Sequence, residues 1–572
     1  MNQSLPAWAR EMRDLFRSGT CSQFLLHGNV FDVVPHGGKM LSVSSFLDEV
    51  MFAGYDVILH YDRSRGIRAV QGAEDWSQWV NSVLGAENRG QAYLREPGAA
   101  LELIDRYLLR TLNLQALGDA RVAGRKLAVV VDFAEFVVPR GDALALGGPF
   151  SANVVKVLGW ANDPAVLHAN IITVLLAEGL HDLNELVSEN PHAVALQVPL
   201  PDEGEMQTYL AALVEQKMPE LPAASDVAPD QLAARLTGLS RIGAQRVLAR
   251  AVRQGERITP QWLTRQKKDA IERECQGLLD FIESDLTLDH VAGLDAVRAW
   301  LREDAELLRR GALHALPMGY LIAGRIGTGK TFLVTCWAGE LGIPCVVFKN
   351  FRDRWVGATE SNLERIFGVL RALGQVVVFV DEADQAAGKR GGGDTDGGLS
   401  GRVYSMLAKE MSDTRNRGRI IWVFATSRPD LLEVDLKRQG RLDVHIPLFP
   451  PETAAERRAL LGAVVRKLKV PVAESDLPDL PGDITLGGNE IEGVLVRALR
   501  TWELSKEPRP ALAEILLDVV REVRPSAHTR KLEYMDLVAV KECTDARFLP
   551  ARFRDLTPDE VEGRIEELRR FV

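Results

Sequence analysis

The sequence predicts an α/β protein whose C-terminal half is built on a parallel sheet. Continuous apolar runs recur there with helical segments between them, and such runs are typical of strands buried on both faces. The predicted strands are Tyr320–Ala323, Cys345–Phe348, Val376–Val380 and Ile420–Ala425. The first run ends in a glycine-rich turn directly before a helical segment, which is the chain order of a βαβ unit.

The pattern becomes helical after about Pro450. Apolar residues recur at spacings of three and four in Ala454–Leu468 and in Asn489–Leu504. We therefore predict a small helical lid after the sheet.

The N-terminal half shows the same pattern more weakly. Its predicted strands are Phe24–Leu26, Val57–Tyr61, Leu127–Val131 and Ile171–Leu176, followed by a helical tail at Gln231–Arg253. Pro219–Pro229 is rich in Pro and Ala and predicts a linker. The charged segment Gln266–Glu283 predicts a helix that joins two units of similar architecture, although a solvated surface helix would have the same pattern.

Composition limits the class of protein. With 572 residues, the chain is longer than one hydrophobic core usually serves, so several domains are expected. No apolar run is long enough to span a bilayer, and we expect a cytoplasmic protein without membrane insertion. Nucleic acid is disfavoured as a partner, because a formal net charge of −10 opposes binding to phosphates. The five cysteines form no paired motif, so neither a disulfide framework nor a zinc site is predicted.

The turn after the first C-terminal strand carries a phosphate-binding motif. Gly324–Thr331 fits GxxxxGK[ST], in which backbone N–H groups and the helix N-terminus surround phosphate oxygens. Lys330 is expected to meet the β and γ phosphates, and Thr331 to bind Mg²⁺. The residues predicted to bind ATP here are Gly324, Ile326, Gly327, Thr328, Gly329, Lys330, Thr331 and Phe332.

Two carboxylates follow the strand Val376–Val380. Asp381 is expected to hold the Mg²⁺ shell, and Glu382 to polarise the water that attacks the γ-phosphorus. Their order after the glycine-rich turn predicts hydrolysis of ATP rather than binding alone.

These residues closely resemble the AAA clade of AAA+ ATPases over about residues 285–504. The segment Leu288–Leu294 is similar to the part that lines the adenine pocket, which implies that Val291 and Ala292 contact the base. Gly488 and Asn489 resemble the start of the lid helix beside the adenosine. Ser427 stands where the clade normally has the sensor 1 Asn, so its reach toward the γ-phosphate is shorter and hydrolysis is expected to be slow.

The resemblance also implies a ring. Ala425–Asp443 is similar to the second region of homology, and Arg438 and Arg441 have the spacing of arginine fingers that complete a neighbour's site. Trp355 and Val356 match the first pore loop, where an aromatic side chain can grip an extended polypeptide; an ordinary buried Trp is the alternative. The glycine-rich Gly388–Gly401 takes the place of a second pore loop or is plain disorder.

The N-terminal half has lost the corresponding motifs. Asp132 follows Leu127–Val131, but Phe133 stands where a catalytic Glu is needed. No Lys-Ser/Thr pair follows the strand Phe24–Leu26, so ATP hydrolysis is not expected there. With the charged linker segment, this half resembles the cyanobacterial and plastid AAA ATPases that carry a degenerate N-terminal AAA-like domain.

The predicted organisation is an AAA+ parallel sheet with a helical lid, preceded by a degenerate AAA-like α/β domain. The boundaries are 1–218 for the degenerate domain, 219–260 for a linker and lid-like segment, 261–284 for the charged linker helix, 285–449 for the large ATPase domain, and 450–572 for the lid and C-terminal extension.

Three functions are compatible with these predictions. The leading one is a homo-oligomeric ATPase, expected to be a hexamer, that remodels or threads a protein partner of unknown identity. The second is an ATP-gated regulatory scaffold with slow turnover, which Ser427 and the silent N-terminal half favour. The third, a nucleic-acid remodeller, is opposed by the acidic net charge.

Overall fold

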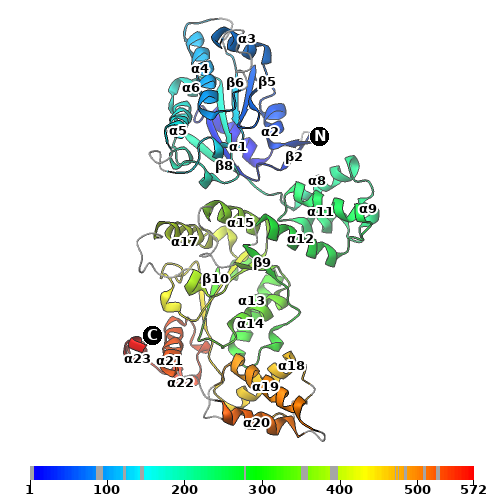
Figure 1. The fold of residues 1–572 in the computed structure, drawn as a ribbon, viewed down its shortest axis with the longest axis vertical. Coiled ribbons are helices and arrows are strands. Elements are labelled where there is room, and N and C mark those ends of the chain that lie inside the picture. The colour runs from blue at the N-terminus through cyan, green and yellow to red at the C-terminus, as the bar shows by residue number, and fades with distance from the viewer. Residues whose placement is uncertain are drawn as a thin grey trace. The chain divides into compact units, whose positions relative to one another are not determined.

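A computed structural model gives the fold of the chain (Figure 1). It describes residues 5–84, 94–119, 124–141, 147–275, 278–348, 359–386, 397–470, 472–473, 476–481, 486–506, 510–523 and 528–571. The chain divides into two compact units, residues 1–271 with 357–372 and residues 272–356 with 373–572. In the described part of the chain, every helix is too short or too polar to span a bilayer.

The N-terminal unit is built on a six-stranded sheet in the order β5-β4-β6-β7-β1-β8. Its strands are β1 (Gln23–Gly28), β4 (Val57–Asp62), β5 (Gly66–Gln71), β6 (Leu127–Val131), β7 (Ile171–Leu176) and β8 (Ala193–Val198). All pair in parallel except β5, which runs antiparallel to β4 at the edge. The four strands predicted in this half are confirmed, and β5 and β8 were not foreseen.

Helices cover both faces of this sheet, which explains why its strands are continuously apolar. Alternate strand residues pack on one face with α3 (Ala73–Leu84), α4 (Pro97–Ala116) and α5 (Gly147–Asn162), and on the other with α1 (Ala7–Arg17) and α2 (Val43–Phe46). The remaining short elements are α6 (Pro164–His168), α7 (Glu185–Ser188) and the hairpin of β2 (Val33–His36) and β3 (Lys39–Ser42). Gly37 and Gly38 form the turn of this hairpin and are not part of a phosphate-binding loop.

Five helices follow the sheet in the N-terminal unit. They are α8 (Glu203–Gln216), α9 (Leu221–Ala224), α10 (Pro229–Leu236), α11 (Arg241–Gln254) and α12 (Pro260–Glu274). The predicted linker Pro219–Pro229 is wrong as a separator, because Leu221 and Val227 are buried and α8 packs on α10. Apolar side chains in this Pro-rich stretch complete the small helical core.

The second unit repeats the topology of the first. Its sheet has the order β14-β10-β13-β12-β11-β9, with strands β9 (Leu279–Ile282), β10 (Gly319–Ala323), β11 (Cys345–Phe348), β12 (Val376–Val380), β13 (Ile420–Thr426) and β14 (Val444–Pro447). When the five parallel strands of each sheet are numbered along the chain, both sheets read 5-1-4-3-2. The duplicated architecture predicted from the sequence is therefore present in the strand order.

One predicted helix is shorter than expected. The charged pattern predicts a helix over Gln266–Glu283, but α12 ends at Glu274 and Leu279–Ile282 forms β9. This strand pairs antiparallel with β11, and Leu279 is fully buried. An open sheet edge beside β11 explains why pairing outweighs the helical pattern here.

Helices complete the second unit (Figure 1). Those between the strands are α13 (Asp295–Arg309), α14 (Lys330–Leu341), α16 (Ala383–Ala386) and α17 (Gly397–Met411). Helix α15 (Thr359–Leu373) lies between β11 and β12 along the chain, but all of it except Leu373 groups with the first unit. The lid contains α18 (Ala454–Lys467), α19 (Gly488–Leu504) and α20 (Leu512–Glu522), which share one core. The C-terminal extension contains α21 (Thr529–Glu542), α22 (Ala551–Arg554) and α23 (Pro558–Leu568), and α21 packs on α23.

Candidate functional site

The phosphate-binding loop connects β10 to α14, as the motif predicts. Gly327 and Gly329 have φ of 88° and 85°, a left-handed conformation that L side chains rarely adopt. Gly324 approaches the carbonyl of Leu448 so closely that a Cβ there would collide with it. These three glycines are therefore required by the backbone, whereas Ile326 is exposed and Phe332 packs partly on the core.

Lys330 lies at the first position of α14. Its Nζ donates to the carbonyl oxygens of Gly324 at 2.7 Å and Arg325 at 3.1 Å. Burial lowers the pKa of Lys330, while the nearby Asp381, Asp384 and Glu382 carboxylates oppose that shift. Because the ammonium is held by two carbonyls of the loop it serves, it is already next to the position that phosphates would fill.

Thr331 and Asp381 meet although they lie on different elements. The Thr331 hydroxyl donates to Asp381 Oδ2 at 2.8 Å. A hydroxyl and a carboxylate at the foot of a phosphate loop are the oxygen ligands that Mg²⁺ prefers, since the ion takes few protein ligands and several waters. The residues present therefore fit ATP with Mg²⁺, held by Lys330, Thr331 and Asp381.

Glu382 follows Asp381 with an unusual backbone. Its φ is 48°, one of few positive values outside glycine in the described residues, and its side chain is exposed. Its N–H donates to Asp381 Oδ1 at 2.9 Å. The turn separates the two carboxylates, so that one remains on Thr331 and the other is open to solvent.

The sensor position lies at the end of β13, beside the end of β12 that carries Asp381 and Glu382. Ser427 is half-buried and directly follows Thr426, whose hydroxyl donates to Asp384 Oδ1 at 2.5 Å. The Arg428 N–H donates to Thr426 Oγ1 at 2.9 Å. Sequence reasoning missed Thr426 and Asp384, although the spacing of Asp384 from Glu382 could have drawn attention to it.

The lid joins the phosphate loop through its second helix. The Gly488 N–H donates to the Gly327 carbonyl at 2.9 Å, so α19 begins against the loop, while Asn489 is exposed. On the other side, Val291 is buried in the core of the sheet and Ala292 is half-buried. The structure therefore brings Gly488 to the loop, and the roles of Val291, Ala292 and Asn489 toward adenine remain predictions.

The two candidate arginine fingers differ in exposure. The Arg438 side chain is 67% exposed and pairs with Asp435 at 2.9 Å. The Arg441 side chain is 14% exposed, and its Nη1 donates to the Asp435 carbonyl oxygen at 2.7 Å. Trp355 and Val356 lie outside the described residues, as does most of Gly388–Gly401.

Family models match three successive parts of the chain. Residues 320–449 match the ATPase family associated with various cellular activities, the AAA family. This part of the chain is an AAA ATPase domain. Residues 2–199 match the N-terminal Rossmann-like domain of AAA+ chaperones, and residues 206–276 match their second helical domain. The narrower resemblance to cyanobacterial and plastid members stays a prediction, as do the domain boundaries drawn from the sequence.

Relatives of known name are AAA ATPases. The chain is 34% identical over 211 residues to the ATP-dependent zinc metalloprotease FtsH 1 of Symbiobacterium thermophilum, covering 35% of each chain. It is 27% identical over 413 residues to the peroxisomal ATPase PEX6 of Rattus norvegicus, covering 65% of this chain and 42% of the relative. The chain thus spans less than half the length of these relatives.

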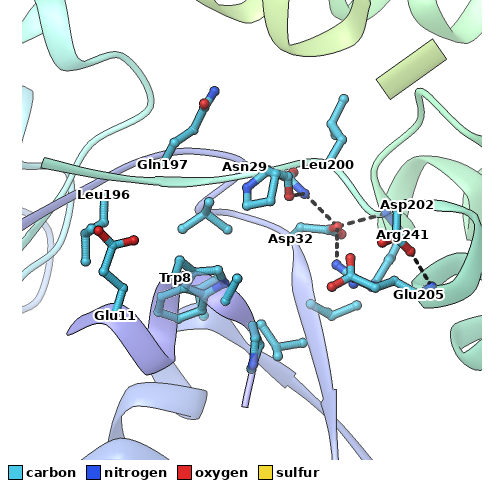
Figure 2. A pocket seen from close by; sticks show the side chains of 17 residues that line it. Trp8, Glu11, Asn29, Asp32, Leu196, Gln197, Leu200, Asp202, Glu205 and Arg241 are labelled. Carbon is cyan, nitrogen blue, oxygen red and sulfur yellow. Dashed lines mark hydrogen bonds and ion pairs between the residues drawn. The ribbon is translucent and has the colours of Figure 1, made fainter. Parts of the chain in front are cut away.

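In the N-terminal unit, a carboxylate lies in the loop after β1, which corresponds to the phosphate-binding loop after β10. After β1, the buried Asp32 accepts the N–H groups of Arg241 at 2.9 Å and Ile242 at 3.0 Å. Those amides open α11, the counterpart of α19, in which Gly488 donates to Gly327 instead. A cavity of about 380 Å³ lies beside Asp32 and is lined by Glu11, Asp202, Glu205 and Arg241, among others (Figure 2). Four carboxylates and one guanidinium make this cavity unsuited to a triphosphate.

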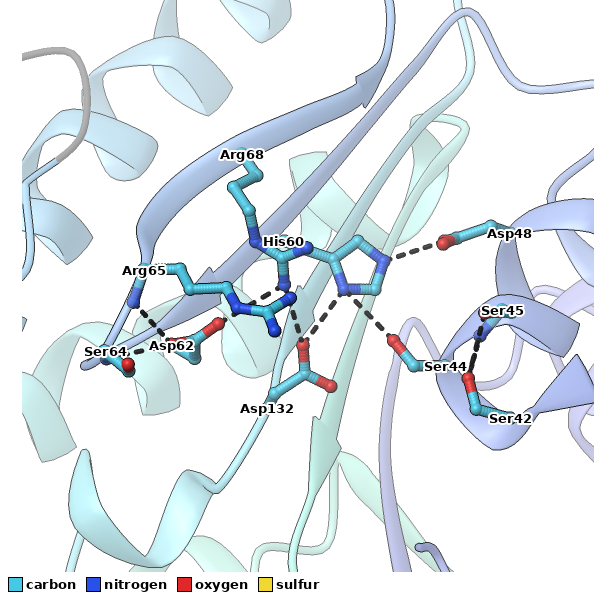
Figure 3. A network of polar contacts seen from close by, with 10 residues as sticks. All are labelled: Ser42, Ser44, Ser45, Asp48, His60, Asp62, Ser64, Arg65, Arg68 and Asp132. Atoms are coloured by element: carbon cyan, nitrogen blue, oxygen red, sulfur yellow. Dashed lines mark hydrogen bonds and ion pairs between the residues drawn. The ribbon is translucent and has the colours of Figure 1, made fainter. Parts of the chain in front are cut away.

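The side chain of His60 compensates the charge of Asp132, the counterpart of Asp381. The buried His60 ring contacts Asp132 Oδ2 through Nδ1 at 3.1 Å and Asp48 Oδ1 through Nε2 at 2.7 Å (Figure 3). Burial opposes the charged ring, but these hydrogen bonds and charges raise the pKa of His60 to about 9. An imidazolium ion therefore lies beside this carboxylate at neutral pH, where the second unit would place a metal.

Proposed function

We propose that the chain works as a homo-oligomeric AAA ring, expected to be a hexamer, that uses ATP hydrolysis to remodel a protein partner. The observation that carries the proposal is the exposure of Arg438. Its guanidinium has Asp435 as its partner among the described residues and is open to solvent over two thirds of the side chain. A neighbouring chain can bring such a group to the phosphates, where it neutralises charge in the transition state.

Mixing two inactive variants tests the ring. Arg438→Ala removes the finger but keeps the phosphate loop, and Glu382→Gln removes the water-polarising carboxylate but keeps the finger. Each alone is expected to lose ATP turnover, by about 100-fold or more. In a mixture, Arg438 of a Glu382→Gln chain completes the site of an adjacent Arg438→Ala chain. Turnover is expected to recover in proportion to the number of such adjacent pairs.

The matched control is Arg415→Ala. Arg415 is 88% exposed and pairs with Asp413, so its loss removes a similar surface charge outside the proposed boundary. Turnover that stays absent in the mixture, with both variants folded and assembled, would show that Arg438 does not act between chains. Light scattering with and without ATP measures the subunit number.

Remodelling is tested at the pore loop. Trp355→Ala is expected to leave ATP turnover within about twofold and to abolish unfolding of a bound polypeptide, because gripping relies on apolar contact. Glu382→Gln, which binds ATP without hydrolysing it, supplies the trap that identifies the partner by co-purification. Unchanged remodelling by Trp355→Ala rules out threading through this loop.

A slow ATP-gated scaffold is the second candidate function. The shorter reach of Ser427 and the carboxylate-filled N-terminal loop favour it. Negligible turnover that no polypeptide stimulates, together with tight ATP binding, would support the scaffold over the motor.

A further inference from the structure

Helix α21 buries polar side chains that its packing does not require. Its residues from Tyr534 to Val540 are buried, and it packs on β14 and on the 3₁₀ turn Pro429–Leu431 that closely follows Ser427. Tyr534 and Asp536 face this interior, where an uncompensated polar group costs free energy. Apolar residues would fill the same space, so the contacts of these two side chains need an explanation.

Tyr534 contacts the loop that carries the sensor. Its hydroxyl donates to Asp430 Oδ2 at 3.1 Å, and the same carboxylate accepts from Arg428 Nε at 2.9 Å and Nη2 at 2.8 Å. The Arg428 guanidinium also lies 5.2 Å from the centroid of the Tyr534 ring. Because Ser427 lies between Thr426 and Arg428, Tyr534 holds the segment that directs the sensor side chain.

Asp536 contacts the phosphate loop. Its Oδ2 lies 3.8 Å from Nη1 of Arg325 and 3.6 Å from Nη2 of Arg552, and its Oδ1 has no hydrogen-bond partner in the described residues. The Arg325 carbonyl is one of the two that hold Lys330. Burial raises the pKa of Asp536 to about 6, although the two arginines oppose that shift. A buried carboxylate with two long ion pairs contributes little to stability. We therefore attribute to Asp536 the positioning of the Arg325 side chain.

The last turn of α21 reaches the arginine-finger segment. Glu542 pairs with Lys437, whose Nζ also donates to the Pro429 carbonyl at 3.0 Å. Lys437 directly precedes Arg438. One helix of the extension therefore contacts the phosphate loop, the sensor loop and the finger segment through side chains of its own.

We propose that α21 positions the catalytic loops of this ATPase, with Tyr534 as the positioning residue of the sensor loop and Asp536 as that of the phosphate loop. The inference rests on ATP binding and hydrolysis and is independent of ring remodelling. Helix α21 thereby gives the C-terminal extension a role in ATP hydrolysis. The two residues act on different parts of the site, so their loss has different kinetic signatures.

Two conservative variants of the full chain separate these signatures. Tyr534→Phe removes one hydroxyl and keeps the ring; it is expected to lower kcat about 10-fold with KM for ATP unchanged, because the sensor acts on the attacking water. Asp536→Asn is expected to raise KM for ATP and the Kd of a fluorescent ADP analogue about fivefold, because the phosphate loop binds both nucleotides. Melting temperature is measured for each variant.

The control is Glu533→Gln, which neutralises an exposed carboxylate on the same helix. It is expected to change none of the three constants. A purely structural role for α21 predicts that Tyr534→Phe and Asp536→Asn lower stability and alter kcat and KM together, and that result would overturn the proposal. Unchanged constants in both variants would overturn it as well.

A double-mutant cycle covers the case in which Asp536→Asn folds poorly. Arg325→Gln, measured alone and with Asp536→Asn, is expected to show that the two losses in ADP affinity do not add, since each removes the same contact. Additive losses would show that Asp536 does not act through Arg325. ADP binding needs no hydrolysis, so this arm decides the coupling even if the wild-type chain turns over too slowly for kinetics.

Discussion

The two units share one sheet topology but hold different groups at its catalytic edge. In the second unit, open glycines, Lys330 and the pair of Thr331 with Asp381 leave room for a nucleotide and its metal. In the first, Asp32 occupies the amides of α11 and His60 neutralises Asp132. The comparison shows how a nucleotide fold can keep its architecture after replacing the ligand's charges with side chains: a carboxylate where phosphate would be, and a protonated ring where a cation would be.

The largest expected difference between the units lies at the residue that follows the aspartate after the third parallel strand, Glu382 in the second unit and Phe133 in the first. Glu382→Gln is expected to lower ATP turnover about 1,000-fold, because the amide cannot polarise the attacking water. Phe133→Leu, at the corresponding place in the first unit, is expected to leave turnover unchanged. Phosphate release from the purified chain measures both, and loss of turnover in Phe133→Leu would mean that the first unit contributes to hydrolysis.

Asp32 tests whether the first unit depends on its internal charge. Asp32→Ala is expected to lower the free energy of unfolding of this unit by about 3 kcal/mol, since it leaves two helix-terminal amides without their acceptor and leaves the buried Arg241 paired with Glu205 alone. Glu203→Gln, an exposed acidic residue at the start of α8, is the control and is expected to change it little. Urea unfolding followed by tryptophan fluorescence reports the difference; equal stabilities of Asp32→Ala and wild type would contradict this role.

His60 gives the first unit a pH dependence above neutrality. With a pKa of about 9 in the fold and 6.5 as its ordinary value, the ring stabilises the folded state fully below pH 6.5. That stabilisation, of about 3 kcal/mol, is lost as the pH rises from 6.5 through 9. His60→Gln is expected to flatten this part of the pH profile of melting temperature, and a profile as steep as that of wild type would exclude His60 as its source.

Substitution of Ser427 is expected to change kcat least among these variants that affect turnover. Ser427→Asn restores the longer side chain that the family resemblance implies at the sensor, and it is expected to raise kcat about threefold with KM unchanged. Ser427→Ala is the paired variant and is expected to lower kcat. If both variants leave kcat at the wild-type value, the sensor position does not limit hydrolysis.

The sequence allowed prediction of those features that local patterns determine. The buried strands were recognised from continuous apolar runs, and the phosphate loop from its glycines and Lys330, because each lies within a short stretch of chain. Contacts between distant residues have no such pattern: Asp32 meets Arg241, and Tyr534 meets Asp430, only because the fold brings them together. The error at Leu279–Ile282 has the same cause, since the helix-like spacing there was overruled by pairing with β11.

The backbone just beyond the acidic strand end has a consequence of its own. Glu382 has a φ of 48° and Phe133 a φ of 55°, so both units keep a left-handed residue at the same point. A side chain in that conformation is disfavoured by about 1 kcal/mol or more, and the first unit retains it without any catalytic carboxylate. This bend therefore accompanies the sheet topology that the two units share and does not depend on a catalytic carboxylate. At this bend the two units differ in the side chain alone: it is an exposed carboxylate in the second unit and a phenyl ring in the first.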